Sequence, residues 1–375
     1  MKITSIEVIP VKVPVRSDRA TFTAHGLHVV SHYAIVKVHT DAGLVGLGEA
    51  TVQPRWTGET PASCVAAIEG IIGPALAGFD PTAINLARAR MDRVIKANPF
   101  TKAAVEMALW DITGKAAGVP VHQLLGGKVR DVVPVKMVVG AFDPPEARAM
   151  AERFLADGVR TIKVKTGLGL EADVARVAAV REAAGPDLPI TIDSNCGWNY
   201  ATARLALERM RLLGIRVAEQ PIPPGDNAAM AALRHHSGVP IMADESVFTP
   251  ADAFGVLQAG AADVISVYPG KNAGIAGAVE IAAVARAAGV VCHMGSNLEL
   301  GVASAAMIHV ACAVASIDSE TYPADILGPL YHESDLLRVP LAIGPEGVRA
   351  LDGPGLGVDL DERAVTRYRF DPGAG

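Results

Sequence analysis

Charged side chains recur at a nearly even spacing through the second half of the chain, each at or just beyond the end of a short apolar run. They are Lys165, Asp193, Glu219, Asp244 and Lys271, at intervals of 28, 26, 25 and 27 residues. An interval of this length fits one strand followed by one helix, repeated along the chain. In a parallel barrel the carboxyl ends of the strands meet at one mouth, so we expect these side chains to converge there.

Three consecutive members of this series are carboxylates. Asp193, Glu219 and Asp244 form a set of hard oxygen ligands without any Cys or His, which suits Mg²⁺ or Mn²⁺ better than zinc. Three carboxylates in one mouth would repel one another and destabilise the fold unless a cation neutralised them. The sequence therefore predicts a divalent metal site, with Mg²⁺ as the expected ion and Mn²⁺ as a substitute.

Lysines flank the predicted metal site on two sides. Lys163 and Lys165 are two residues apart on one strand, so both side chains point the same way. Their like charge and a nearby metal ion would lower their pKa values and make one of them a usable base. Lys271 comes four strands later, which is the opposite wall in a ring of eight. This arrangement suits removal of a proton from a carbon next to a carboxylate, with the enolate stabilised electrostatically.

The elements that must position these residues divide into a small N-terminal part and a long repeat. Alternating strands followed by helical segments predict an α+β capping domain over residues 1–128. Residues 129–340 alternate short apolar runs with Ala-rich helical segments, which predicts an α/β fold of the (β/α)7β TIM-barrel type. The tail no longer fits the repeat, so residues 341–375 are expected to return to the capping domain.

The ordered motifs resemble those of the enolase superfamily, and more narrowly its muconate lactonizing enzyme (muconate cycloisomerase) subgroup. The matching segments are KVK at 163–165 (KxK), DSN at 193–195 (DxN), EQP at 219–221, DES at 244–246, PGKNAG around Lys271, and the domain junction AVEMALWDITGKAAGVPVHQLLGG at 104–127. The resemblance extends over essentially the whole chain. It implies a capping domain over a modified barrel and proton abstraction next to a carboxylate.

The resemblance also implies roles for single residues. The metal ligands would be Asp193, Glu219 and Asp244, and the catalytic lysines Lys163, Lys165 and Lys271. Lys165 would be the base on one face and Lys271 its counterpart on the other. Lys163 would tune Lys165 and touch the substrate carboxylate. Asn195 and Glu245 would support the ligands from behind.

Substrate contacts are expected from both domains. Two loops of the capping domain, roughly residues 18–30 and 51–60, would close over the mouth, with His25 and Trp56 as candidates. From the barrel, Glu299 resembles an acidic residue of muconate cycloisomerases. Asp318, in DSE, loosely resembles the DxD with which dipeptide epimerases hold an ammonium group. His293 is expected to pack or to support the site, because Lys271 stands where a His–Asp pair would need its aspartate.

Several functions remain open at this stage. The first is a muconate cycloisomerase-like isomerase acting on a small carboxylate substrate. Racemisation or epimerisation of an amino-acid derivative or dipeptide would use nearly the same residues, and dehydration of a hydroxy acid is a third outcome. The GLGLEA segment at 167–172 satisfies the GxGxxA outline of a dinucleotide site, which would indicate an NAD-dependent oxidoreductase. The remaining alternative is a non-catalytic barrel that serves as a binding or structural module.

The composition limits the kinds of partner that the protein is expected to bind. Lys and Arg total 34 against 40 Asp and Glu, for a net charge of −6, and no basic stripe indicates nucleic acid or an anionic membrane. The four cysteines lie far apart, which disfavours a disulfide framework. The uncharged stretch between Glu299 and Asp318 is better explained as a buried helix than as a membrane span. We expect a cytoplasmic homo-oligomer.

Overall fold

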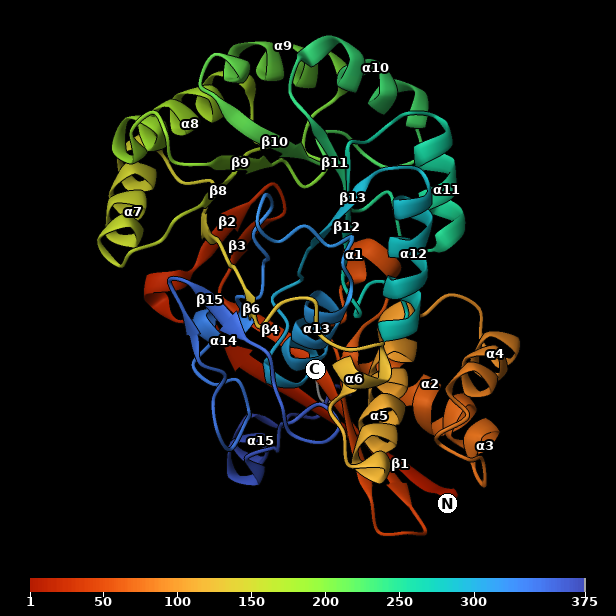
Figure 1. The fold of residues 1–375 in the computed structure, drawn as a ribbon. Helices are drawn as coiled ribbons and strands as arrows, with labels where there is room; N and C mark the ends of the chain where they lie inside the picture. The colour runs from red at the N-terminus through yellow and green to blue at the C-terminus, as the bar shows by residue number, and fades with distance from the viewer. Residues whose placement is uncertain (374–375) are drawn as a thin grey trace.

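The computed structural model describes residues 1–373, and its N-terminal part is an antiparallel sheet covered by helices (Figure 1). β1 (Ile3–Pro14), β4 (Val30–Thr40) and β5 (Val45–Ala50) pair in the order β1-β4-β5. The turn at 41–43 joins β4 to β5. The covering helices are α2 (Pro61–Ala67), the π-helical η2 (Ile68–Ile72), α3 (Gly73–Leu76), α4 (Ile84–Val94) and α5 (Pro99–Ala117).

Helix α5 can lie close to this sheet because β5 carries glycines at the contact. A Cβ atom on Gly46 or Gly48 would overlap a main-chain carbonyl of α5, at Ala108 or Ala104. The other side of α5 contacts the barrel helices α12 (Ile275–Ala287) and α13 (Gly301–Ala313). The helix is therefore buried on both sides and joins the two parts of the chain.

Seven parallel strands form the barrel sheet, in the order β13-β12-β11-β10-β9-β8-β7. The strands are β7 (Met137–Val139), β8 (Ile162–Lys165), β9 (Ile190–Asp193), β10 (Ile215–Glu219), β11 (Ile241–Ala243), β12 (Val264–Val267) and β13 (Val291–Met294). The helices that follow the first six strands are α7 (Pro144–Ala156), α8 (Leu170–Ala184), α9 (Tyr200–Arg211), α10 (Asn227–Ser237), α11 (Pro250–Gln258) and α12, which form the outer ring in Figure 1. The predicted barrel with a capping domain is confirmed.

The ring closes through two isolated bridges in place of a full eighth strand. Ile317 pairs with Cys292 of β13, and Ala324 pairs with Val135 just before β7, both in parallel. The amide of Asp325 then donates to the carbonyl of Met294, the last residue of β13, at 2.9 Å. This irregular closure delivers Asp325 to the mouth of the barrel.

The chain beyond the barrel contacts both parts of the molecule. β15 (Gly347–Arg349) pairs with β14 (Ile343–Gly344) and with β6 (Val132–Val133), which precedes the barrel. Helix α15 (Glu362–Tyr368) lies against β1 of the capping sheet. The domain limits near residues 128 and 340 remain predictions.

Short elements of the capping domain cover the barrel mouth. A two-stranded hairpin, β2 (Thr21–Thr23) and β3 (Gly26–His28), follows the 3-10 turn η1 (Ser17–Arg19), and α1 (Pro54–Thr57) follows β5. On the barrel side, α6 (Val121–Leu124) precedes the repeat and α14 (Gly328–Tyr331) follows Asp325. The β2–β3 hairpin and α1 fall within the two capping-domain loops, residues 18–30 and 51–60, that the sequence assigns to substrate contact.

No helix within residues 1–373 combines the length and the apolarity needed to cross a lipid bilayer. The uncharged stretch before Asp318 folds into α13, in which every residue from Gly301 to Cys312 is buried. It is a core helix between α5, α6 and α12, as predicted.

Replacing Gly48 by Ala should destabilise the capping domain, because the new methyl group would collide with the main chain of α5, which cannot move aside like a side chain. We expect a loss of about 3 kcal/mol, measured as a lower midpoint of urea unfolding. Gly70→Ala is the control, since a Cβ atom there meets open space. Equal midpoints for the two variants would contradict this packing.

Candidate active site

A cavity of about 390 Å³ lies between the capping loops and the carboxyl ends of the barrel strands. Its barrel side is charged, with the acidic residues Asp193, Glu219, Asp244 and Asp325 and the lysines Lys163 and Lys165. Its capping side is mainly aromatic and neutral polar, and includes His25, His28, Tyr33, Arg55 and Trp56. Ser296, Asn297 and Leu298, in the loop after β13, also line it.

Each carboxylate of the predicted metal site is paired with one of the predicted lysines. The ammonium group of Lys165 lies 2.6 Å from Asp193, that of Lys163 lies 2.6 Å from Glu219, and that of Lys271 lies 2.6 Å from Asp244. The three carboxylates are at most 3 % exposed. Buried charges require such partners, because an unpaired ion in the interior costs several kcal/mol.

Glu219 and Asp193 differ in how easily they ionise. Burial raises the pKa of Glu219 to about 7, with Lys163 acting against it and the neighbouring Asp193 and Asp244 adding to it. Burial would also raise the pKa of Asp193, but Lys165 and Lys163 together bring it below its ordinary value. A cation placed among these oxygens would relieve the repulsion that Glu219 experiences.

Lys163 behaves differently from the sequence-based expectation. Burial alone would lower its pKa, but Asp325, Glu219 and Asp193 raise that pKa well above its ordinary value. The surrounding carboxylates therefore outweigh the lysine next to it and act against the predicted lowering for Lys163. This residue stays protonated, which fits a group that binds an anion and not one that removes a proton.

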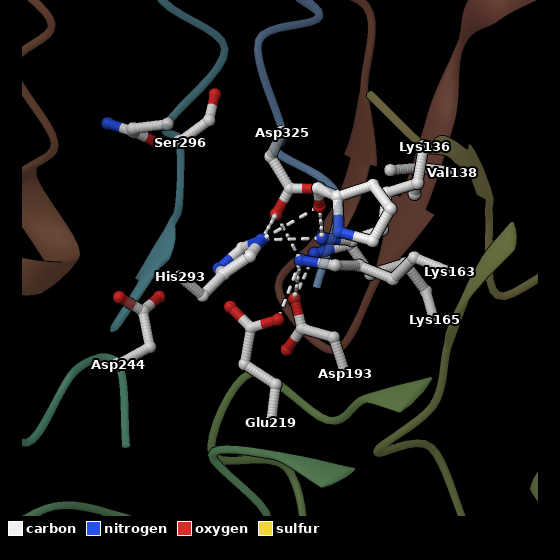
Figure 2. A network of polar contacts seen from close by, with 12 residues as sticks. Lys136, Val138, Lys163, Lys165, Asp193, Glu219, Asp244, His293, Ser296 and Asp325 are labelled. Atoms are coloured by element: carbon white, nitrogen blue, oxygen red, sulfur yellow. Dashed lines mark hydrogen bonds and ion pairs between the residues drawn. The ribbon is translucent and has the colours of Figure 1, made fainter. Parts of the chain in front are cut away.

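A cluster that the sequence analysis missed adjoins this set (Figure 2). Asp325 accepts from Lys163 and lies 3.0 Å from the ammonium group of Lys136, which is itself 2.6 Å from Nε2 of His293. Lys136 also donates to the carbonyl of Pro323 at 2.6 Å. All of these side chains, including that of Pro323, are buried. Lys136 lies inside the apolar run VVPVKMVV, where an unpaired lysine would cost several kcal/mol. This isolated charge was the sequence feature that could have indicated a buried partner.

The charges of this cluster are fixed by its contacts. Burial would raise the pKa of Asp325, but Lys136 and Lys163 hold it far below its usual range. Burial and Lys136 hold the pKa of His293 well below its ordinary value, so the imidazole is neutral. Burial lowers the pKa of Lys136 to about 8, against the opposing effect of Asp325. His293 therefore accepts a hydrogen bond from Lys136 and supports the cluster, consistent with a supporting role.

Two sets of side chains in this region could hold a metal ion. Within residues 1–373, Glu219, His293 and Asp325 have ligand atoms that all lie within 4.8 Å of one another. The ammonium groups of Lys136 and Lys163 already contact those atoms, which disfavours a cation there. Asp193, Glu219 and Asp244 do not form so tight a group in the described chain, because each is drawn to its own lysine.

The all-oxygen set nevertheless fits Mg²⁺ by its chemistry. Its members end or follow three neighbouring strands, β9, β10 and β11, and all three line the same cavity. One further buried carboxylate oxygen, Oε2 of Glu245, has no hydrogen-bond partner and lies one residue beyond Asp244. Mg²⁺ takes hard oxygen ligands and keeps positions for water or substrate oxygens, which this set of carboxylates allows.

Asn195 and Glu245 contact each other next to the predicted ligands, and Asn195 also lines the cavity. The amide of Asn195 donates to Oε1 of Glu245 at 3.2 Å, and its carbonyl oxygen accepts from Lys165 at 2.9 Å. Asn195 and Asp193 thus hold the ammonium group of Lys165 together.

The structure separates the predicted substrate contacts into two groups. His25 and Trp56 line the cavity, and Trp56 packs on Tyr268 and Phe100. Glu299 and Asp318 do not line it. Glu299 is buried and accepts from Ser296 and the amide of Asn297.

The carboxylate of Asp318 accepts a hydrogen bond from the amide of Thr321. Asp318 follows Ile317, which pairs with Cys292 near the start of β13, so it lies away from the end of that strand at the barrel mouth. The geometry therefore does not support a substrate contact for Asp318. Asp325, seven residues later, is the acidic residue that reaches the cavity from this segment.

Comparison with known proteins decides the family. Residues 5–126 match the mandelate racemase/muconate lactonizing enzyme N-terminal domain, and residues 146–364 match the enolase C-terminal domain-like family. The chain belongs to the enolase superfamily, in its muconate lactonizing enzyme subgroup. Its relatives include a racemase, a cycloisomerase and an epimerase, all of which are isomerases. This chain is likewise an isomerase of the enolase superfamily.

Relatives with different activities are about equally similar to this enolase-superfamily chain. It is 36 % identical to muconate cycloisomerase 1 of Rhodococcus opacus over 97 % of this chain and 96 % of that protein. The structure of N-succinyl Arg/Lys racemase of Bacillus cereus aligns with a TM-score of 0.95 at 33 % identity, over 99 % of both chains. A dipeptide epimerase of Enterococcus faecalis, solved with Mg and a dipeptide, aligns with a TM-score of 0.90 at 31 % identity, over 96 % of this chain and all of that one.

A hydrogen-bonded chain joins the capping wall of the cavity to the barrel side. Nδ1 of His332 lies 2.8 Å from the carbonyl of Gly328 and must donate to it. Nε2 of His332 therefore accepts from the hydroxyl of Ser31 at 2.8 Å, and His28 donates to that hydroxyl at 2.6 Å. Burial lowers the pKa of His332 to about 4, so the ring is neutral in the folded enzyme.

This neutral histidine should make stability depend on pH. Below pH 6.5 the unfolded chain binds a proton that folded His332 excludes, so stability falls as the pH drops from 6.5 towards 4. The full loss attributable to His332 is about 3 kcal/mol. His332→Asn should flatten the pH dependence of the unfolding temperature in this range, whereas exposed His235→Asn should not. Parallel profiles for wild type and His332→Asn would contradict the assignment.

Proposed function

We propose that this enzyme is a Mg²⁺-dependent isomerase that removes a proton from a carbon next to a carboxylate, with a muconate-like diacid or its lactone as substrate. The observation that carries the proposal is the pairing of Lys165 with Asp193 at the edge of an all-carboxylate site in one cavity. Lys165 is the least buried amine of the set, so it is the one that substrate can reach. The family match supports this class of chemistry.

Asp193, Glu219 and Asp244 are the proposed metal ligands. Bound Mg²⁺ would offset two of the three negative charges of these carboxylates and lower the energy of negative charge developing on the substrate carboxylate. The same ion would compete with Lys165, Lys163 and Lys271 for the carboxylate oxygens. Lys165 would then have a free amine facing the cavity.

Lys165 is the proposed base, and Lys163 the proposed anion-binding group. Lys163 is held protonated by Asp325 and Glu219, so it can bind substrate carboxylate but is a poor proton acceptor. In the direction from lactone to diacid, Lys165 takes the proton next to the carboxylate. The electron pair left on that carbon forms the new double bond, and the ring C–O bond breaks to release the second carboxylate. In the other direction the same amine returns the proton.

The position of Lys271 favours chemistry on one face of the substrate. Its side chain is fully buried, does not line the cavity, and donates to both a carboxylate oxygen and the carbonyl oxygen of Asp244. A reaction with a single base, such as cycloisomerisation, needs only Lys165.

Racemisation or epimerisation of an amino-acid derivative is the second candidate. It needs a base on each face, and Lys271 lies on the other side of the metal ligands from Lys165. Metal binding at Asp244 would break the 2.6 Å contact that now holds Lys271. The likeness to N-succinyl Arg/Lys racemase supports this candidate.

Substrate consumption in D₂O separates the two candidates. Loss of the ultraviolet absorbance of cis,cis-muconate with Mg²⁺ present would support cycloisomerisation. Deuterium at the α-carbon of an N-succinylamino acid or dipeptide, in both enantiomers, would support the two-base reaction. Release of water from a hydroxy acid would identify a dehydratase, and inertness towards all three classes would refute the proposal.

Lys165→Ala should abolish proton exchange while leaving metal binding intact. We expect the exchange rate of the accepted substrate to fall by about 10²- to 10⁴-fold, since a positioned base is lost. Mg²⁺ affinity, measured by calorimetry, should be retained, because the three carboxylates remain. Lys96→Ala, an exposed change outside the cavity, is the control. An unchanged exchange rate in Lys165→Ala would rule out its role as the base.

A further inference from the structure

The GLGLEA segment, which fits the outline of a dinucleotide site, has its backbone donors occupied from within the chain. The amides of Gly167, Leu168 and Gly169 all donate to Oδ2 of Asp173, at 2.9, 3.0 and 2.9 Å. Asp173 lies in the first turn of α8 and is fully buried. Three successive amides of this kind form an anion-binding concavity, and here the anion is the protein's own carboxylate. The interpretation of this loop as a nucleotide site is therefore wrong.

The same carboxylate connects the loops after two neighbouring strands. Oδ2 of Asp173 accepts a fourth hydrogen bond, from the indole of Trp198 at 2.9 Å. Trp198 belongs to the loop after β9, whereas Gly167 belongs to the loop after β8. These loops directly follow the proposed base, Lys165, and the proposed ligand Asp193.

Arg176 extends the connection to a third loop. It pairs with Oδ1 of Asp173 at 2.6 Å and donates to the carbonyl of Phe142, in the loop after β7. It also donates to the carbonyl of Lys165 at 3.3 Å. The guanidinium is 3 % exposed, so this ion pair is a fixed part of the interior.

The three connected loops form the surface on which the β2–β3 hairpin rests. A Cβ atom on Gly167 or on Gly197 would approach the methyl group of Ala24, at 3.1 and 2.9 Å. In the loop after β7, the amide of Ala141 donates to the carbonyl of Phe22 at 2.6 Å. Each of the three loops therefore contacts the hairpin directly.

We propose that Asp173, together with Arg176 and Trp198, is a positioning network that holds this docking surface in register. Its consequence for catalysis rests on the proposed function: a loosened hairpin would place His25 less well over the cavity and weaken substrate binding. The network touches neither the cavity nor the proposed ligand side chains. Its link to the proposed base is the hydrogen bond from Arg176 to the main-chain carbonyl of Lys165, so it acts mainly on closure of the site.

Hydrogen exchange of the full-length protein tests the network without any substrate. In Asp173→Asn the charge-assisted hydrogen bonds are weakened, and we expect the amides of residues 21–28 and of Ala141 to exchange about ten-fold faster or more. The β1–β4 pairing should keep its wild-type rates. Trp198→Phe, which removes one donor and keeps the ring, should give a smaller effect in the same segments. Glu171→Gln, an exposed acidic residue on the same helix, is the matched control.

Kinetics with the accepted substrate provide the second readout. Asp173→Asn should raise KM about ten-fold with a smaller change in kcat, because binding and not chemistry is affected. Wild-type hairpin exchange in both Asp173→Asn and Trp198→Phe would overturn the proposal, as would acceleration spread evenly over the whole chain. Failure to find any substrate would refute the proposed function and leave the exchange result to decide the network.

Discussion

Pairing between buried amines and buried carboxylates is the constraint on which this structure depends. Lys136, Lys163, Lys165 and Lys271 face Asp193, Glu219, Asp244 and Asp325 inside a barrel mouth that excludes most of the solvent. Removing one member of such a pair leaves an uncompensated ion and costs about 3–5 kcal/mol. The strands must therefore end where these charges can meet, and the capping domain must cover them without separating them.

This pairing also explains how metal binding and base activation can be linked. Every proposed Mg²⁺ ligand is in contact with a lysine, so a divalent cation and an ammonium group compete for the same oxygens. The four amines balance the four carboxylates, and a divalent ion adds two positive charges. An enolate formed from a carboxylate carries two negative charges. The charge of the proposed intermediate therefore matches the site.

The barrel and five of the charged residues at its strand ends could be predicted because the same strand–helix pattern repeats along the chain. Lys165, Asp193, Glu219, Asp244 and Lys271 recur at similar intervals, and parallel strands bring such residues together. The mouth position of Asp325 could not be predicted in this way. It lies 32 residues after His293, since the closing segment forms two isolated bridges and not a strand. Asp318 was predicted instead because DSE loosely resembles the DxD of dipeptide epimerases.

Hydrogen-bond and ion-pair partners that are set by tertiary contacts also could not be predicted from the sequence. Lys136 is a single charge in an apolar run, and no neighbouring residue in the sequence indicates that Asp325 and His293 are its partners. Likewise the GLGLEA glycines resemble a phosphate loop, and only the fold shows that Asp173 and Trp198 satisfy its donors. Local motifs identify which groups need a partner, and packing decides which partner they receive.

The proposed site requires a divalent cation to displace lysines from the carboxylates of Asp193, Glu219 and Asp244. Anomalous diffraction from crystals of the full-length enzyme grown with Mn²⁺ tests it most directly. We expect one strong peak among the carboxylates of Asp193, Glu219 and Asp244, with Lys165 turned towards the cavity. A peak among Glu219, His293 and Asp325, or no bound ion with the lysine pairs intact, would contradict the account.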